Sequence, residues 1–216
     1  MADYSLSGTH LKLNQLCDKI GSDYFVMPVF INIFEMSAYD FISRKVKEIE
    51  KTQTIVDDIR DLIIPKSLNV ISDPSSLGDY ITGLPSDYFR LLAHNVYYKD
   101  GTECRRSDLI KHAEYETAKL NPNKKPSRYY PLILQYASTF QISAGPDAIP
   151  SSLKITYCKK PSFADVSNPQ IRIVNLPDDS IDNILKKTVV ELFNKTADPR
   201  FASSDKLEKE YQKIFK

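Results

Sequence analysis

The sequence predicts an α+β protein in which a small antiparallel, sandwich-like β-domain lies between helical segments. Apolar residues recur at helical spacing before residue 66 and after residue 177, whereas the middle of the chain contains short runs rich in aromatic and β-branched residues. Proline and glycine separate these runs, which favours many short strands over a βαβ layout. We therefore expect an N-terminal helical segment (1–66), a β-rich domain (80–175) and C-terminal helices (177–216) that pack back on the N-terminal bundle.

The N-terminal part is expected to form two main helices. The first begins near Pro28, a residue that suits a first helical turn. Its apolar residues cover much of its circumference, so it is expected to be buried in a bundle or in an oligomer. Those residues are Phe30, Ile33, Phe34, Phe41, Tyr39, Ile42, Val46 and Ile49. A second helix is expected from Thr54, a candidate cap, to Ile63, where Pro65 stops it. A shorter helix is expected around residues 14–20.

Residues 66–80 are rich in Ser, Asp, Asn, Pro and Gly and are predicted to form a loop that joins the first two parts. Beyond it, Asp100-Gly101 predicts a turn, and a helical segment around 109–120 interrupts the strands. The predicted strands are 88–98, 129–136, 139–143, 153–157 and 171–174.

The clearest helix follows Pro177, since its apolar residues recur at i, i+3, i+4, i+8, i+11 and i+12 from Ile181. Asp178 and Asp179 complement the positive end of its dipole. A final amphipathic helix is predicted from Ser204 to Phe215. A terminal amphipathic segment after a proline can dock on another surface, so its apolar face is the predicted partner interface. The residues of that face are Leu207, Tyr211, Ile214 and Phe215.

Composition excludes several classes of function. The 216 residues carry a formal charge of +1, whereas a duplex-DNA binder usually has a clear basic excess. No apolar run approaches the roughly 20 residues that span a bilayer, so we expect no membrane association. The N-terminal residues lack the pattern of a signal peptide. Cys17, Cys104 and Cys158 are far apart and predict neither a disulfide framework nor a zinc site, which favours a reducing cytoplasm.

No group of residues predicts catalysis. The histidines are His10, His94 and His112, and none has a partner at metal-ligand spacing. Nucleophile-elbow, P-loop and dinucleotide-binding patterns are absent from the sequence. The acidic pairs at 57–58 and 178–179 lie at predicted helix starts, where carboxylates are favoured anyway. We therefore predict no catalytic, cofactor-binding or metal-ligating residue and no enzyme activity; a hydrolase would have to depend on His112 or Glu114.

Five phrases in a fixed order carry a resemblance to a known family. The phrases are Gln53–Leu62 with Asp57-Asp58, Leu84-Pro85-x-Asp87-Tyr88 with Leu109, Asn121-Pro122 with Lys125-Pro126, Ile155-x-Tyr157-x-Lys159-x-Pro161, and Leu176-Pro177 with the helix after it. Together they cover nearly the whole chain, and it resembles the head-to-tail connector proteins, also called adaptor or ring proteins, of tailed bacteriophages. The similarity is closest to the connectors of crAss-like phages. His112–Tyr115 departs from the pattern, which has a different acidic pair there.

The resemblance implies a structural virion protein without enzymatic activity. Such proteins assemble, usually as twelve copies, into a ring below the portal that lines the DNA passage and links the portal to the tail. The implied partners are further copies of the chain, the portal protein and adjacent connector or tail proteins, and the genome passes without sequence-specific binding. The implied location is the virion, after assembly in the host cytoplasm.

The residues themselves leave an alternative open. The chain contains 13 Tyr and 10 Phe but no Trp, and tyrosine suits protein interfaces as well as sheets. A non-enzymatic intracellular binding or scaffold module could therefore use the aromatic β-domain as its docking surface.

Overall fold

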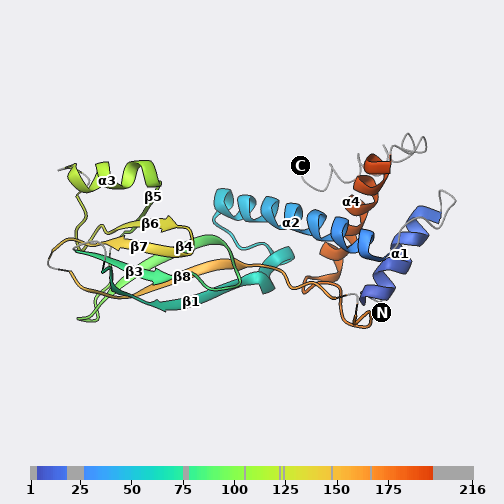
Figure 1. Cartoon of the computed structure of the whole chain (residues 1–216), viewed down its shortest axis with the longest axis horizontal. Coiled ribbons are helices and arrows are strands. Elements are labelled where there is room, and N and C mark those ends of the chain that lie inside the picture. Colours follow the sequence, from blue (N-terminus) through green and yellow to red (C-terminus); the bar gives the residue numbers. More distant parts are fainter. Residues whose placement is uncertain are drawn as a thin grey trace. The chain divides into compact units, whose positions relative to one another are not determined.

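In the computed structural model the chain forms two compact units, and the predicted mixed α+β fold is confirmed (Figure 1). We call residues 1–62 with 161–216 the helical unit and residues 63–160 the β unit. The β unit is thus one continuous insertion in the sequence of the helical unit. These bounds do not coincide with the ranges 1–66, 80–175 and 177–216 expected from the sequence. The structure describes residues 4–18, 27–74, 78–104, 106–121, 123, 125–146, 148–165 and 167–196.

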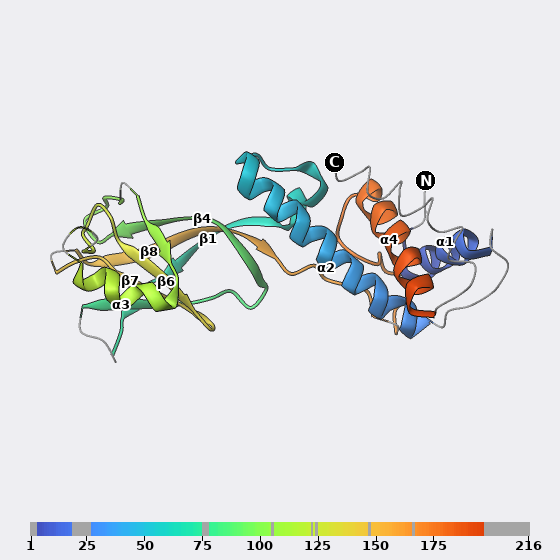
Figure 2. The same cartoon turned by 90° about the horizontal axis from the view of Figure 1, so that it is seen from above.

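Three α-helices and a short 3₁₀ helix form the described part of the helical unit (Figure 2). They are α1 (Leu6–Asp18), α2 (Met27–Thr52), η1 (Asp57–Leu62) and α4 (Asp178–Thr196). The helix α4 packs against both α2 and α1. Most of the apolar residues predicted to wrap around α2 are buried within the unit itself, which confirms the bundle. The completely buried side chains include Leu6, Leu13, Phe30, Phe34, Phe41, Ile42, Val46, Ile59, Leu62, Ile181, Ile184 and Val189.

The helix predicted from Thr54 to Ile63 is wrong in its type and its end. The helix α2 ends where Gln53 adopts a left-handed φ of 57°, and residues 57–62 then form the 3₁₀ helix η1. Because Ile63 and Ile64 pair with a distant strand, sheet hydrogen bonds replace a further helical turn. The Ser180 hydroxyl donates to the Asp58 carbonyl oxygen at 3.1 Å, and Lys45 Nζ lies 2.8 Å from Asp58 Oδ2, so η1 is tied to both α2 and α4.

The segment 161–176 leads from the β unit to α4 without a regular strand. The predicted strand 171–174 is wrong, because these residues make only isolated bridges, from Arg172 to Ser5 and from Val174 to Phe163. The Leu6 backbone N–H donates to the Ile171 carbonyl oxygen at 2.9 Å. The segment therefore anchors the start of α1 through single hydrogen bonds rather than through a sheet.

The β unit consists of two sheets and one helix. The three-stranded antiparallel sheet has the order β1 (Ile63–Asn69), β8 (Pro150–Lys159), β4 (Tyr88–Tyr98). The five-stranded sheet has the order β2 (Ile71–Ser72), β3 (Asp79–Gly83), β7 (Thr139–Ser143), β6 (Leu132–Tyr136), β5 (Asp108–Ile110). Its β5–β6 pair is parallel, unlike the antiparallel sheet that the sequence predicted, and α3 (His112–Leu120) follows β5 directly.

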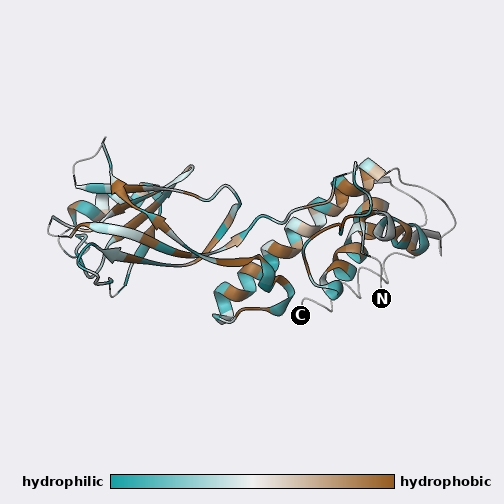
Figure 3. Ribbon diagram, turned by 90° about the horizontal axis from the view of Figure 1, so that it is seen from below, coloured by the Kyte–Doolittle hydropathy of each residue, from teal (hydrophilic) through white to brown (hydrophobic). Residues whose placement is uncertain are grey.

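Alternation along the strands produces two apolar layers. Inward-facing residues of both sheets form the larger cluster, which includes Val96, Ile133, Phe140, Ile142, Leu153, Ile155 and Tyr157. On the other face of β6, Leu132 and Leu134 pack against Tyr115 and Ala118 of α3. The helix therefore covers the outer face of the five-stranded sheet. Figure 3 shows apolar and polar residues interspersed along the strands and helices, as this arrangement requires.

The loop predicted at 66–80 is wrong over its first half, where β1 continues to Asn69 and β2 follows. Pro65 lies inside β1, which is an edge strand of its sheet, and there a proline removes no ladder hydrogen bond that the sheet needs. The predicted strands 88–98 and 139–143 are confirmed residue for residue. The predicted strand 153–157 lies within the longer β8, and the predicted Asp100-Gly101 turn is confirmed, with a φ of 81° at Gly101.

Candidate interaction surface

The three histidines lie in three different elements. His10 lies in α1 against the Phe30 ring, His94 lies in β4, and His112 begins α3 beside the Tyr136 ring. Burial lowers the pKa of His94, so its imidazole is neutral at physiological pH. Over the described ranges, no three or more His, Cys, Asp and Glu side chains gather closely enough to hold a metal ion.

The acidic pairs noted in the sequence make structural contacts. Asp58 contacts Lys45 and Ser180, as given above. At the start of α4, Asp178 lies 2.7 Å from the Arg172 guanidinium, which also donates to the Leu176 carbonyl oxygen. Glu116 forms an i,i+3 ion pair with Lys119 on α3. These carboxylates fix helix ends and loops, and they do not face one another as an acid–base pair would.

The two cysteines whose side chains are described are buried thiols. Burial raises the pKa of Cys158 to about 11, so the thiolate that would act as a nucleophile is scarce near neutral pH. Cys104 donates to Asn95 Oδ1 at 2.7 Å and packs in the core of the β unit. Both residues therefore serve packing.

The β unit instead exposes a group of tyrosines. Tyr129 and Tyr130 are each 52% exposed and lie next to each other just before β6, in the segment 126–131, which bends at residues 128–130. We call this segment the tyrosine bend. Tyr136, at the far end of β6, is also more than half exposed. Exposed adjacent aromatic rings with polar tips are typical of protein interfaces, so the tyrosine bend is the candidate interaction surface of this unit.

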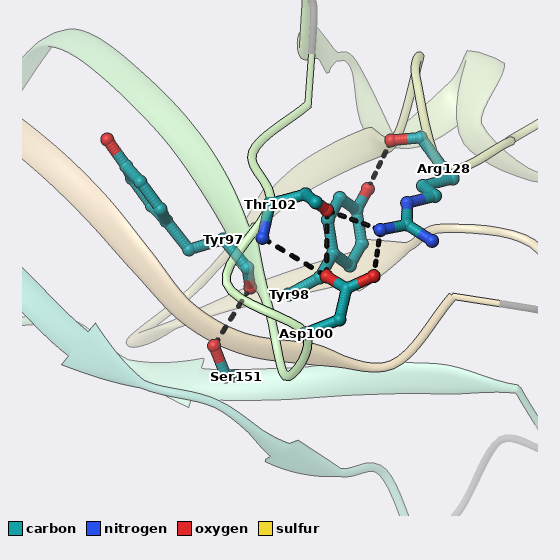
Figure 4. Close-up of polar contacts among 6 residues, drawn as sticks. All are labelled: Tyr97, Tyr98, Asp100, Thr102, Arg128 and Ser151. Carbon is teal, nitrogen blue, oxygen red and sulfur yellow. Dashed lines mark hydrogen bonds and ion pairs between the residues drawn. The ribbon is translucent and has the colours of Figure 1, made fainter.

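Contacts with the end of β4 and the turn after it hold the tyrosine bend from one side (Figure 4). The Tyr98 hydroxyl donates to the Arg128 carbonyl oxygen at 2.6 Å. The Arg128 guanidinium donates to the side chains of Asp100 and Thr102, and its carbon lies 5.6 Å from the centre of the Tyr98 ring. Asp100 Oδ1 also accepts from the backbone N–H of Thr102 at 3.1 Å and from its hydroxyl at 2.8 Å. The turn around Gly101 thus positions the residue that precedes both exposed tyrosines.

The protonation states of Asp100 and Tyr98 favour the hydrogen bonds just described. Hydrogen bonds from Thr102 and then from Arg128 lower the pKa of Asp100, which keeps the carboxylate ionised at neutral pH. Burial raises the pKa of Tyr98, so its hydroxyl remains a donor. Both groups are therefore in the protonation state that these hydrogen bonds require.

A close backbone approach holds the bend from its other side. Gly145 has a φ of 84°, and a Cβ atom added there would lie 3.0 Å from the Pro126 carbonyl oxygen and 3.3 Å from Ser127 Cα. Within the bend, the backbone N–H of Tyr130 donates to the Ser127 carbonyl oxygen at 3.1 Å. Only glycine fits both the conformation and the space, so Gly145 allows residues 126–127 to lie against this loop.

Sequence patterns missed this surface, because Tyr129 and Tyr130 were expected to begin the strand that in fact starts at Leu132. The available signal was the pair Pro126 and Pro131, which bracket the two tyrosines and disfavour regular pairing. The predicted partner contacts Leu207, Tyr211, Ile214 and Phe215 lie outside the described residues.

The two units carry opposite formal charges. The β unit contains 13 Lys and Arg against 9 Asp and Glu, which gives +4, and the helical unit contains 16 against 19, which gives −3. The near-neutral charge of the whole chain therefore conceals a difference between its parts. Among the helices of the described residues, none is long and apolar enough to cross a bilayer.

Comparison of the chain with known protein families found no family whose model matches it. Comparison with curated proteins found no matching relative.

Proposed function

We propose that this protein is a structural subunit of a phage head-to-tail connector, which forms a homo-oligomeric ring below the portal, lines the DNA passage and links the portal to the tail. The observation that carries the proposal is the tyrosine bend, an exposed aromatic surface whose backbone is held by contacts on two sides. Its support from both sides means that Tyr129 and Tyr130 lose little conformational freedom when a partner covers them. The resemblance of the ordered sequence phrases to connector proteins is the reason for proposing a connector ring and not another kind of assembly.

The charge difference between the units supports a head-to-tail arrangement of copies. A ring with more than two subunits uses a heterologous interface, in which two different surfaces of the same chain meet. A β unit of +4 and a helical unit of −3 attract each other when they belong to neighbouring copies. The formal charge of +1 for the whole chain suits a conduit that must let DNA pass without retaining it.

The proposal is tested by the solution mass of the purified protein, measured by light scattering over a range of concentrations and salt. We expect an oligomer that dissociates as salt rises, because screening weakens the attraction between the units. The double variant Tyr129→Ser/Tyr130→Ser should remain folded and shift to smaller species. Ile71→Ser, at a position that is 62% exposed on β2, is the matched control and should assemble as the wild type does. Equal assembly by all three proteins would exclude the tyrosine bend from the interface.

A second function, an intracellular binding or scaffold module, is favoured by the open edge of the five-stranded sheet. Among the described strands, β5 lies at the edge of the sheet beside β6, and its Leu109 is 46% exposed. Such an edge can accept an extended peptide as a further strand. The second function would be favoured over the ring by a monomeric protein that binds a short peptide with micromolar or better affinity. The variant Leu109→Asp should lose this binding.

A further inference from the structure

The imidazole of His94 is enclosed within the β unit. Its Nε2 atom is buried and has no hydrogen-bond partner among the described residues. Across the sheet, His94 pairs with Ile155 of β8, an apolar residue that is completely buried. His112, by contrast, begins α3 at an exposed position. At His94, Nε2 therefore meets neither water nor a protein group to which it can bond.

The neutral His94 ring carries its proton on the other nitrogen. A hydrogen bond with the Ser107 backbone favours the protonated form of the ring. In such a bond the ring is the donor, so the Ser107 carbonyl oxygen is the acceptor. Since Nε2 has no partner, the donor is Nδ1. Nε2 is thus left as an enclosed acceptor with nothing to accept from.

A second contact joins the same two residues, because the Ser107 hydroxyl donates to the His94 carbonyl oxygen at 3.4 Å. On one side of Ser107, the Arg106 backbone N–H donates to the Tyr129 carbonyl oxygen at 3.2 Å. On its other side, the backbone N–H of residue 108 donates to the carbonyl oxygen of residue 131, also at 3.2 Å. His94 therefore holds a segment, 106–108, to which the tyrosine bend is bonded at two points.

Few charges compensate a proton on this ring. Among the described residues, Asp108 is the charged group that favours protonation of His94, and its carboxylate is already shared with Arg106, whose Nε lies 3.0 Å away. The Glu103 carboxylate accepts from the Asn95 amide at 3.0 Å, but Asn95 faces the other side of β4, since successive side chains of a strand alternate. Burial has the largest effect and lowers the pKa of His94.

We propose that His94 is a pH-sensitive switch in which a proton added at Nε2 opens the contact between β4 and residues 106–108 and releases the tyrosine bend on that side. The added N–H finds no acceptor in the closed form, and the charged ring is kept from water. Opening gives the ring access to water and removes both penalties. The switch belongs to the β unit and does not depend on the ring assembly. Where copies associate through the tyrosine bend, acid would weaken their association.

The ordinary pKa of an exposed histidine sets the size of the effect. The ring of the open form titrates near 6.5, so protonation favours the open form by a factor of about ten at pH 5.5 and hardly at all at pH 7.5. The native pKa of His94 is lower than that of the open form. Stability from the enclosed neutral ring is therefore fully present above pH 6.5 and is lost as pH falls towards the native pKa.

Hydrogen exchange of backbone amides, followed by NMR at pH 7.5 and pH 5.5 and corrected for intrinsic rates, tests the switch. The protection factors of the Arg106 and Asp108 amides should fall about tenfold between the two pH values in the wild type. His112→Leu, the matched control, should show the same fall, whereas His94→Leu should change less than about twofold. The Ile42 amide, in the helical unit, is the internal control. An equal fall in His94→Leu and the wild type would overturn the proposal, as would constant protection in the wild type.

A second measurement on the wild type needs no variant. Long-range proton–nitrogen NMR spectra of the histidine rings report which nitrogen carries the proton. We expect His94 to carry it on Nδ1 at pH 7.5 and to titrate with a midpoint below 6.5. A proton on Nε2 at pH 7.5, or a midpoint at or above 6.5, would contradict the switch.

Discussion

The ammonium group of Lys119 lies 2.8 Å from Oδ2 of Asp79, a carboxylate whose side chain is only 1% exposed. Gln141 Nε2 donates to the same oxygen at 3.1 Å. Lys119 comes from α3, Asp79 from β3 and Gln141 from β7, so three elements that are far apart in the sequence meet at one carboxylate. This ion pair fixes α3 on the outer face of the five-stranded sheet.

Removal of Lys119 is expected to destabilise the β unit strongly. Lys119→Met leaves the Asp79 carboxylate buried without its cation, and the loss of one partner from a buried pair costs about 3 kcal/mol or more. The free energy of unfolding, measured by urea titration, checks this value. Lys111→Met, at an exposed lysine near the start of the same helix, is the matched control and should cost less than about 0.5 kcal/mol. In the double variant Asp79→Asn/Lys119→Met, part of the loss should be recovered. Equal costs for the two lysine variants would refute the role of the pair.

Leu185 is expected to carry much of the packing of α4. It is 1% exposed, and Leu185→Ala should lower the free energy of unfolding of the helical unit by about 2–5 kcal/mol. Leu11→Ala removes the same atoms from a leucine that is 59% exposed on α1 and should cost less than about 0.5 kcal/mol. Thermal unfolding followed by circular dichroism distinguishes the two. A similar loss for both leucines would mean that α4 does not pack as described.

The Asp100 network is expected to give the β unit an acid-sensitive component of stability. Hydrogen bonds from Thr102 and Arg128 hold the pKa of Asp100 below its ordinary value of 3.8. The native state therefore binds the Asp100 proton less tightly than the unfolded state, and the stabilisation is present above pH 3.8 and lost as pH falls through the lower native pKa. Asp100→Asn should be less stable than the wild type at pH 7, and the difference should shrink below about pH 4. A difference between the two proteins that stays constant from pH 7 to pH 3, measured by urea titration, would contradict this account.

Cys158 is expected to contribute an alkaline-sensitive component. Burial raises its native pKa to about 11, above the ordinary value of 9.0. Stability from this thiol is thus fully present below pH 9 and is lost as pH rises towards 11. Cys158→Ala should show a shallower decline in unfolding free energy between pH 9 and pH 11 than the wild type. Tyrosines titrate in both proteins, so the difference between the two curves isolates the thiol. Parallel curves would show that Cys158 ionises as freely in the folded chain as in the unfolded one.

Local patterns were sufficient where the spacing of apolar residues matches the face that the element buries. The stripe from Ile181 predicted α4, and alternation of Leu153, Ile155 and Tyr157 predicted β8, because periodicity records which face is buried. Thr54–Ile63 was misassigned because Ile59 and Leu62 follow a helical stripe, while Ile63 pairs with Cys158, ninety-five residues away. No window of sequence contains that pairing.

The candidate surface was harder to predict for a similar reason. Tyr129 and Tyr130 look like strand residues, and their exposure depends on the contacts of neighbouring residues with Tyr98 and Gly145. Each contact joins segments that are more than ten residues apart, so the bend can be recognised only once the sheets are assembled. The buried Asp79 was likewise invisible in the sequence, since nothing near it indicates Lys119 as its partner.

Electron microscopy of the purified protein, alone and after incubation with its portal protein, tests the proposed function most directly. We predict closed rings of one size that stack on the portal, and loss of these rings in Tyr129→Ser/Tyr130→Ser but not in Ile71→Ser. A wild-type protein that remains monomeric at all concentrations and does not associate with the portal would contradict the assignment as a connector ring subunit.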